Sequence, residues 1–330
     1  MKARRQQSGY VLLMVLGALA VMALVVQRFA QRNDELRRNA LDFQQYAAGS
    51  AAVSSALAQT AYWMATRPLL PAGRGDGTGR LRMDGALYQS ADGALLRVQD
   101  FRGLLSANGV PRPVLQSLLV QDGVSPARAQ AMVDVLDDYI DTDNLKRLNG
   151  AERAEYRALG LPGPRNDWLV SLRELETMPL WRDEPERLAR LTALLTPDVG
   201  HLFNPATAPE ATLRAMFPLM ARAQIDQVLM LRARDQLLDL RQLRQIFAMP
   251  LDEDDYILFP GNDARVTLWA PGLPRALEYN LRLTPAGELG PWVITEQHST
   301  KRLNLSDEAP RALAFPLSPS VSSATGSVVP

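Results

Sequence analysis

The chain has 330 residues, of which 47% are apolar and 22% are charged, and its basic and acidic residues balance. Its length exceeds that of one typical domain, and its composition is that of a folded protein with a buried core. The zero net charge gives no support for a nucleic-acid-binding protein, and the absence of cysteine excludes a disulfide framework.

The chain begins with a basic leader that is followed by an apolar segment. Residues 10–26 carry no charged side chain and, as a helix, reach roughly 25 Å, the low end of what crosses a bilayer. A cleaved secretory signal is the alternative, with Ala-Leu-Ala at 18–20 as the cleavage site, but apolar residues continue directly through that site. Basic residues flank the segment on both sides in nearly equal number, so the positive-inside rule does not determine which end of the segment is cytoplasmic.

The helix predicted for this segment continues far beyond it. Residues 27–67 contain no proline, are rich in Ala, Leu, Gln and Arg, and place apolar side chains along one face until Pro68 ends the pattern. We therefore predict one helix of about 58 residues from Tyr10 to Arg67, roughly 85–90 Å long. An ordinary membrane anchor has no need of such a helix.

Two regions with strand character flank a helical region. Short apolar runs at 79–105, with Asp-Gly pairs at 84–85 and 92–93, are typical of hairpins, and residues 264–296 have the same character. Residues 111–250 between them have helical periodicity. The sequence therefore predicts a large helical insertion between strands.

The helical region contains N-cap signals and a weak repeat. Ser125, before a proline, is a predicted N-cap. Residues 169–179 and 237–250 share Leu, then Ser or Asp, then Leu-Arg-x-Leu and Met-Pro, with Ser171 and Asp239 as further predicted N-caps. Two copies of a small helical unit are one interpretation, and chance recurrence in a leucine-rich chain is the other.

An acidic loop follows the first long helix of this region. Asp141 and Asp143 alternate, and Glu152 follows Asp141 at the separation of the first and last ligands of an EF-hand. Leu145 and Lys146 stand where that loop needs a ligand and a glycine, so the segment is not an EF-hand. The loop is either a hard-cation site or a solvated acidic helix end. Further oxygen donors are available at Asn149 and Glu155.

Other chemistries have little support. The only histidines, His201 and His298, are far apart in sequence, and no nucleophile elbow, phosphate-binding loop or cysteine cluster occurs, so we expect no enzyme. The acidic run at 252–256 is read as a solvated cap rather than a second cation site. Two alternatives remain open: a helix-hairpin-helix nucleic-acid module at 114–133, and a membrane-anchored periplasmic enzyme.

The N-terminal pattern resembles a type IV prepilin-like N-terminus. The resemblance implies cleavage between Gly9 and Tyr10 by a prepilin peptidase on the cytoplasmic side of the inner membrane. Most such subunits carry glutamate at the fifth mature position, and this chain has Met14 there. That substitution resembles the largest minor pseudopilin of type II secretion systems, the K subunit, which lies at the filament tip.

Further segments are similar to the same K pseudopilin family. They are "VQDFRGLLSAN" at 98–108, "DYIDTDNLKRLNGAERAEY" at 138–156, "RNDWLVSLREL" at 165–175 and "FNPATAP" at 203–209. The resemblance implies a calcium (Ca²⁺) site whose best side-chain candidates are Asp141, Asp143, Glu152 and Glu155. It also implies a tip complex with two smaller minor pseudopilins above the major pseudopilin, no nucleic acid, a role in filament initiation and protein export, and a single-pass protein whose C-terminal domain is periplasmic.

Together these patterns predict an α+β fold with a long N-terminal pilin-type helix, a small antiparallel β-sheet and a large, mostly α-helical insertion between strands. The expected segments are a leader at 1–9, the N-terminal helix at 10–67, the first part of the β domain at 68–110, a helical subdomain with the acidic loop at 111–200, a second helical subdomain at 201–260, the second part of the β domain at 261–305, and a disordered tail at 306–330.

Overall fold

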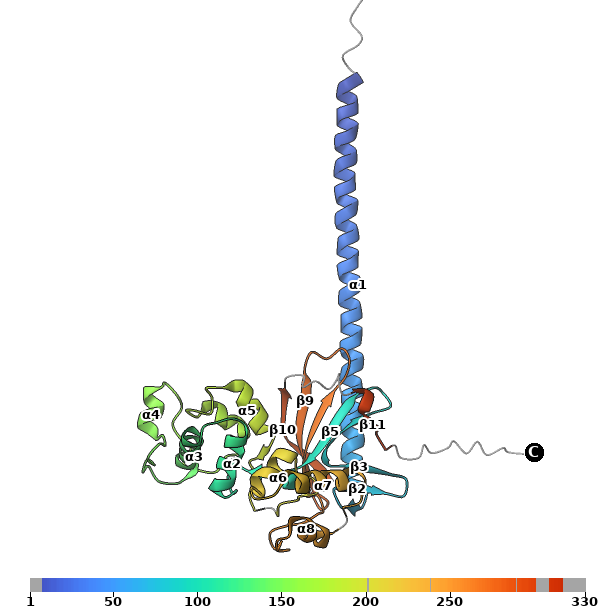
Figure 1. The fold of residues 1–330 in the computed structure, drawn as a ribbon. Coiled ribbons are helices and arrows are strands. Elements are labelled where there is room, and N and C mark those ends of the chain that lie inside the picture. Colours follow the sequence, from blue (N-terminus) through green and yellow to red (C-terminus); the bar gives the residue numbers. More distant parts are fainter. Residues whose placement is uncertain (1–7, 201, 238, 289, 301–308, 317–330) are drawn as a thin grey trace, which may run out of the picture.

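The computed structural model describes residues 8–200, 202–237, 239–288, 290–300 and 309–316. Its longest element is α1 (Ser8–Thr66), a single helix of 59 residues that projects from the rest of the molecule (Figure 1). The predicted continuous helix is therefore confirmed.

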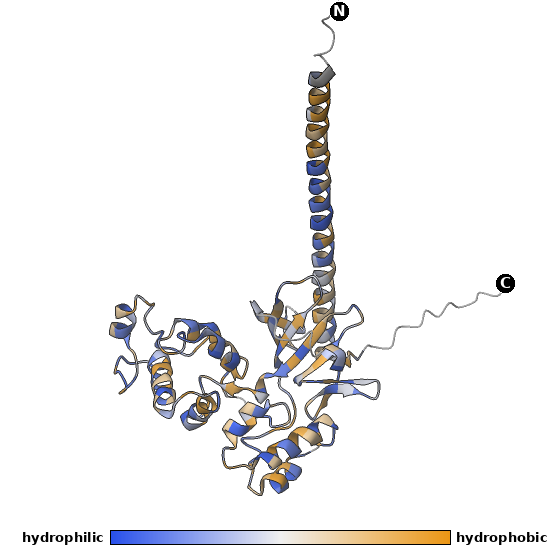
Figure 2. Ribbon diagram, turned by 45° about the horizontal axis from the view of Figure 1, so that its top comes forward, coloured by the Kyte–Doolittle hydropathy of each residue, from blue (hydrophilic) through white to orange (hydrophobic). Residues whose placement is uncertain are grey.

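Only the lower part of α1 packs against the protein. Among the described residues, α1 is the one helix long and apolar enough to cross a membrane. Figure 2 shows apolar turns at its outer end and hydrophilic turns before it reaches the sheet. Beyond the apolar segment, large side chains stay exposed along the free part of the helix. They are Phe29, Leu36, Phe43 and Tyr46.

The two strand regions of the sequence join into one six-stranded sheet. Strand β5 pairs antiparallel with β8, from Leu95 opposite Trp269 to Asp100 opposite Ala264, and so bridges the whole helical insertion. In spatial order the strands are β10 (Trp292–Thr300), β9 (Ala276–Leu283), β8 (Asp263–Trp269), β5 (Leu95–Asp100), β4 (Asp84–Gln89) and β11 (Leu313–Ala314).

One face of this sheet packs on α1. Val53, Trp63 and Met64 of the helix belong to the same buried apolar cluster as Leu96 and Val266 of the sheet. Gly49 makes the approach possible, because a Cβ there would lie 2.4 Å from the Pro271 carbonyl oxygen. The predicted helix thus doubles as one layer of the β domain's core.

Two smaller sheets complete the strands, and one predicted turn is wrong. Asp92 and Gly93 form the turn between β4 and β5 as expected, but Asp84 and Gly85 begin β4 at a register irregularity instead of turning a hairpin. The smaller sheets are β1 (Leu69–Leu70), β2 (Gly73–Asp76) and β3 (Gly79–Arg82), and the parallel pair β6 (Leu105–Ser106) and β7 (Leu195–Thr196).

The insertion is helical, as predicted. Ser125, Ser171 and Asp239 each accept a backbone N–H at a helix start, which confirms the three N-caps. The helices are η1 (Phe101–Gly103), α2 (Arg112–Gln121), α3 (Pro126–Ile140), α4 (Arg153–Ala158), η2 (Leu172–Thr177), α5 (Pro185–Thr192), α6 (Glu210–Met216), α7 (Arg222–Ala233) and α8 (Leu240–Phe247).

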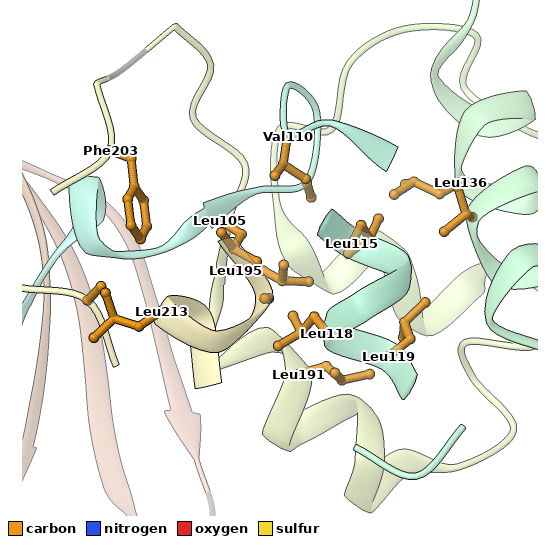
Figure 3. Close-up of a cluster of buried hydrophobic side chains, with 14 of the residues drawn as sticks. Leu105, Val110, Leu115, Leu118, Leu119, Leu136, Leu191, Leu195, Phe203 and Leu213 are labelled. Carbon is orange, nitrogen blue, oxygen red and sulfur yellow. The ribbon is translucent and has the colours of Figure 1, made fainter. Parts of the chain in front are cut away.

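The two helical segments share one hydrophobic core. Leu115 and Leu118 of α2, Leu195 of β7 and Leu213 of α6 are fully buried in a cluster whose members, apart from Ala72, come from residues 105 to 258 (Figure 3). The division into two subdomains at residue 200 therefore does not correspond to two cores, because α2 packs against α6 across it.

The tail contains an ordered segment that the sequence did not predict. Leu313 and Ala314 form β11, parallel to β4, and Phe315 is buried edge-on against Trp63 and Tyr88. The disordered tail expected for 306–330 is thus wrong for residues 309–316, because Ser and Pro content does not reveal one aromatic anchor. The rest of that tail, like leader residues 1–7, lies outside the described residues.

Candidate metal centre

The acidic loop joins the end of α3 to the start of α4. Asp141 is the C-cap residue of α3, and its N–H donates to the Asp137 carbonyl. The loop returns at Glu152, the N-cap residue of α4. Two helix ends thus bring both parts of the sequence-predicted site together.

Three of the four predicted ligands gather at one point. One carboxylate oxygen from each of Asp141, Asp143 and Glu152 lies within 4.8 Å of the other two. Glu152 is 6% exposed, and both of its carboxylate oxygens are buried without a well-formed hydrogen bond from a described residue; the nearby Arg153 N–H satisfies them only weakly. Asp141 Oδ1 is likewise buried without a described donor. Buried charged oxygens without partners are costly, and a hard cation would satisfy all three.

The electrostatics of the loop favour a cation. Burial raises the pKa of the Glu152 carboxyl, and neighbouring carboxylates raise it further. Those neighbours are Asp138, Asp141 and Asp143. Burial also raises the pKa of both Asp137 and Asp138. A divalent ion would relieve this mutual repulsion.

The fourth predicted ligand, Glu155, lies outside this group. It accepts the Glu152 N–H at 3.0 Å and pairs with Lys146 at 2.8 Å. These contacts, led by the hydrogen bond from Lys146, lower its pKa to about 2. Glu155 therefore serves as the capping-box residue of α4, a role that its spacing of three residues from Glu152 also fits.

Two asparagines shape the loop in ways that the sequence did not show. Asn149, considered as an oxygen donor, instead donates its side-chain amide to Asp134 Oδ2 at 3.0 Å. Asn166, from the next segment, has a positive φ of 54° and donates to the Asp143 carbonyl. The sequence showed only that Asn166 belongs to the family-like segment at 165–175, and it did not indicate the contact with Asp143.

Two of the family-like segments meet in a buried joint beside the sheet. Asp100 is fully buried and accepts hydrogen bonds from the Asn204 side chain at 3.1 Å and from Thr207 Oγ1 at 2.8 Å. It also accepts the Gly261 N–H at 2.9 Å. Asp100, at the end of β5, therefore binds both the 203–209 segment in the middle of the insertion and Gly261 just before β8.

A cavity of about 600 Å³ lies between the insertion and the sheet, where an enzyme would place its catalytic groups. Two of its lining carboxylates are engaged in contacts within the protein: Glu278 lies 3.2 Å from Arg265 and 3.3 Å from His298, and Glu296 accepts the Ser171 hydroxyl at 2.7 Å. These contacts hold η2 and α5 against β8–β10.

The turn between α2 and α3 has the predicted helix, glycine turn and helix. Asp122 at this turn pairs with Arg187 and Arg190 of α5, each at 3.0 Å. These ion pairs hold the turn against α5.

The predicted processing site lies at the outer end of α1. Gly9 and Tyr10 belong to its first turn, and Tyr10 is 67% exposed. Leader residues 1–7 lie outside the described residues, and cleavage between Gly9 and Tyr10 stays a prediction.

Comparison with known proteins bears on the helical insertion. Residues 86–197 match the family model described as type II secretion system (T2SS), protein K. A search of curated proteins finds no match. Among solved structures, the chain is similar to one chain of the GspK-GspI-GspJ complex from the enterotoxigenic Escherichia coli type 2 secretion system. That similarity has 17% identity and a TM-score of 0.48, and covers 82% of this chain and 99% of that chain. The family match runs from β4 to β7 and includes the acidic loop, so the predicted resemblance to type II secretion protein K is confirmed over this part of the chain.

Proposed function

We propose that this protein is a minor pseudopilin of a type II secretion system and that it occupies the tip of the pseudopilus. The family match on residues 86–197 supports the proposal, because that segment begins in the sheet that packs on the long, pilin-like helix α1 and continues into the helical insertion. The role is structural: the protein starts the filament and so serves protein export. The apolar segment of α1 anchors it in the inner membrane, with the sheet and the insertion in the periplasm.

The free part of α1 carries this proposal. Its apolar residues at 10–26 need a bilayer, and Phe29, Leu36, Phe43 and Tyr46 beyond them are each more than half exposed. Large apolar side chains in a row on a projecting helix are costly in water, so other helices are expected to cover them. We propose that two smaller minor pseudopilins do so, and that the major pseudopilin follows below.

A binding experiment with two matched variants tests this surface. The full chain is co-expressed with the two smaller minor pseudopilins of its own secretion system and purified in detergent. Phe43→Glu should reduce recovery of both partners at least about tenfold, because a carboxylate would be buried unpaired. Leu219 lies on the insertion and is more exposed than Phe43. Leu219→Glu is therefore the control and should leave the recovery of both partners unchanged. Equal recovery with both variants would place the interface elsewhere.

We further propose that the acidic loop binds Ca²⁺ through Asp141, Asp143 and Glu152. The buried oxygens of Glu152 and Asp141 that lack a well-formed hydrogen bond from a described residue support this choice of ligands. Bound calcium would join the end of α3 to the start of α4 and so stabilise the insertion. Glu155 contributes indirectly, by holding the Glu152 backbone.

A further inference from the structure

Arg147 lies among the carboxylates of the acidic loop. Its Nη1 atom is 3.0 Å from Asp138 Oδ1 and 2.5 Å from Asp141 Oδ2, and its Nε atom is 3.5 Å from Asp137 Oδ2. One guanidinium therefore neutralises part of the charge at the end of α3. No other basic side chain of the described residues is paired with Asp138 or Asp141.

Arg147 and the proposed calcium ion need the same aspartate. Asp141 Oδ2 binds the guanidinium, Asp141 Oδ1 is buried without a described hydrogen-bond partner, and one carboxylate oxygen of this same residue belongs to the group with Asp143 and Glu152. A divalent ion at that group would lie within a few ångströms of a like charge, which weakens its binding. The same positive charge of Arg147 that stabilises the loop without calcium therefore lowers the affinity of the loop for calcium.

We propose that Arg147 is a built-in counter-ion that competes with calcium for Asp141 and so sets the calcium affinity of the loop. The inference rests on the proposed calcium site. Arg147 stabilises the loop when calcium is scarce, and calcium replaces it as the main positive charge when calcium is abundant. The loop thus remains folded in both conditions, and it responds to calcium only above a threshold that Arg147 determines.

The neighbouring basic residues do not share this role. Lys146 is paired with Glu155, outside the carboxylate group. Arg153 is exposed, and among the described residues no ion pair joins it to an acidic residue of the loop. Arg153 is therefore a matched control, because its removal changes the net charge of the loop equally without removing a contact to Asp141.

The backbone allows Arg147 to be changed without loss of the loop. The Arg147 N–H donates to both oxygens of Asp138 at 3.2 Å, and Asn149 remains bound to Asp134. A glutamine at position 147 retains these backbone contacts and removes the charge together with the guanidinium contacts to Asp138 and Asp141. The Arg147→Gln variant is therefore expected to fold.

The test compares the full-length chain in detergent micelles with its Arg147→Gln, Arg147→Lys and Arg153→Gln variants. Calcium chloride is titrated into calcium-depleted protein by calorimetry, and thermal unfolding is followed in chelator. Arg147→Gln should bind calcium about tenfold more tightly than the unmodified chain and should melt at a lower temperature in chelator. Arg147→Lys and Arg153→Gln should stay within about twofold of the unmodified affinity.

The outcomes separate this inference from the calcium site itself. If the unmodified chain binds calcium and Arg147→Gln binds it equally or more weakly, Arg147 organises the ligands or is irrelevant to them, and the competition is wrong. If Arg153→Gln tightens binding as much as Arg147→Gln, general charge explains the effect and the specific contact does not. If neither the unmodified chain nor any variant binds calcium, the proposed calcium site is wrong, and the proposed competition by Arg147 is wrong as well.

Discussion

Gly150 lies directly on the carboxylate of Asp138. A Cβ at position 150 would be 1.9 Å from Asp138 Oδ2, and Asp138 is fully buried. The acidic loop therefore closes over a buried charge at a position where only glycine fits. This contact fixes the path of the chain between Asp141 and Glu152.

The first prediction follows from this contact. Gly150→Ala should destabilise the protein by about 2 kcal/mol, because either the loop or the Asp138 carboxylate must move. Gly163→Ala is the matched control, since its Cβ would meet only the Arg153 side chain at an ordinary 3.6 Å. Denaturant unfolding of both variants provides the measurement. An equal loss of stability in the two variants would contradict the close packing of Gly150 on the Asp138 carboxylate.

Calcium should stabilise the chain through three carboxylates only. At a calcium concentration of about 100 times Kd, the gain in unfolding free energy should be about 2.7 kcal/mol. Asp141→Asn and Glu152→Gln should abolish this gain, whereas Glu155→Gln should retain most of it because Glu155 lies outside the group. Melting temperatures in calcium and in chelator measure the effect. A gain that survives Glu152→Gln would contradict the ligand assignment.

The stability of the chain in chelator should depend on the charge of Glu152. Its pKa is higher in the folded chain than its ordinary value of 4.5, mainly through burial. A carboxyl of this kind stabilises the fold fully below its unfolded pKa and loses that contribution as the pH rises through its folded pKa. Glu152→Gln should therefore be more stable than the unmodified chain at pH 7, and the difference should disappear near pH 4. Unfolding in chelator across this pH range is the check, and a difference independent of pH would contradict it.

The sequence predicted the elements that depend on local pattern. The absence of proline before Pro68 predicted the full length of α1, and the small polar residues before helix starts predicted the caps at Ser125, Ser171 and Asp239. Contacts between distant segments left no such signal. Gly49 is required by the Pro271 carbonyl more than 200 residues away, a relationship that only the fold reveals.

The candidate site was predictable in part for the same reason. Spacing brought Asp141, Asp143 and Glu152 to attention, but spacing alone could not separate a ligand from a capping residue, so Glu155 was grouped with them. The position of Arg147 among three aspartates depends on how the loop folds back, and local charge balance does not determine it.

Maturation should occur at the start of α1. The mature chain should begin at Tyr10, because Gly9 is the small residue between the basic leader and the apolar segment. Gly9→Leu should block cleavage and leave the leader attached. Mass spectrometry of the N-terminal peptide distinguishes these forms. A mature chain that begins near Val21 would instead indicate a secretory signal peptide.

The number of copies of this protein in a filament shows whether it occupies the tip of the pseudopilus. Met14 offers no carboxylate to the N-terminus of a subunit above it, and an unpaired charge in the membrane interior is costly, so this chain should end the assembly. Quantitative mass spectrometry of cross-linked, purified assemblies measures its copy number against the other pseudopilins. We expect one copy of this chain for each copy of the two smaller minor pseudopilins, and a large excess of the major pseudopilin. A copy number that rises with filament length would contradict it.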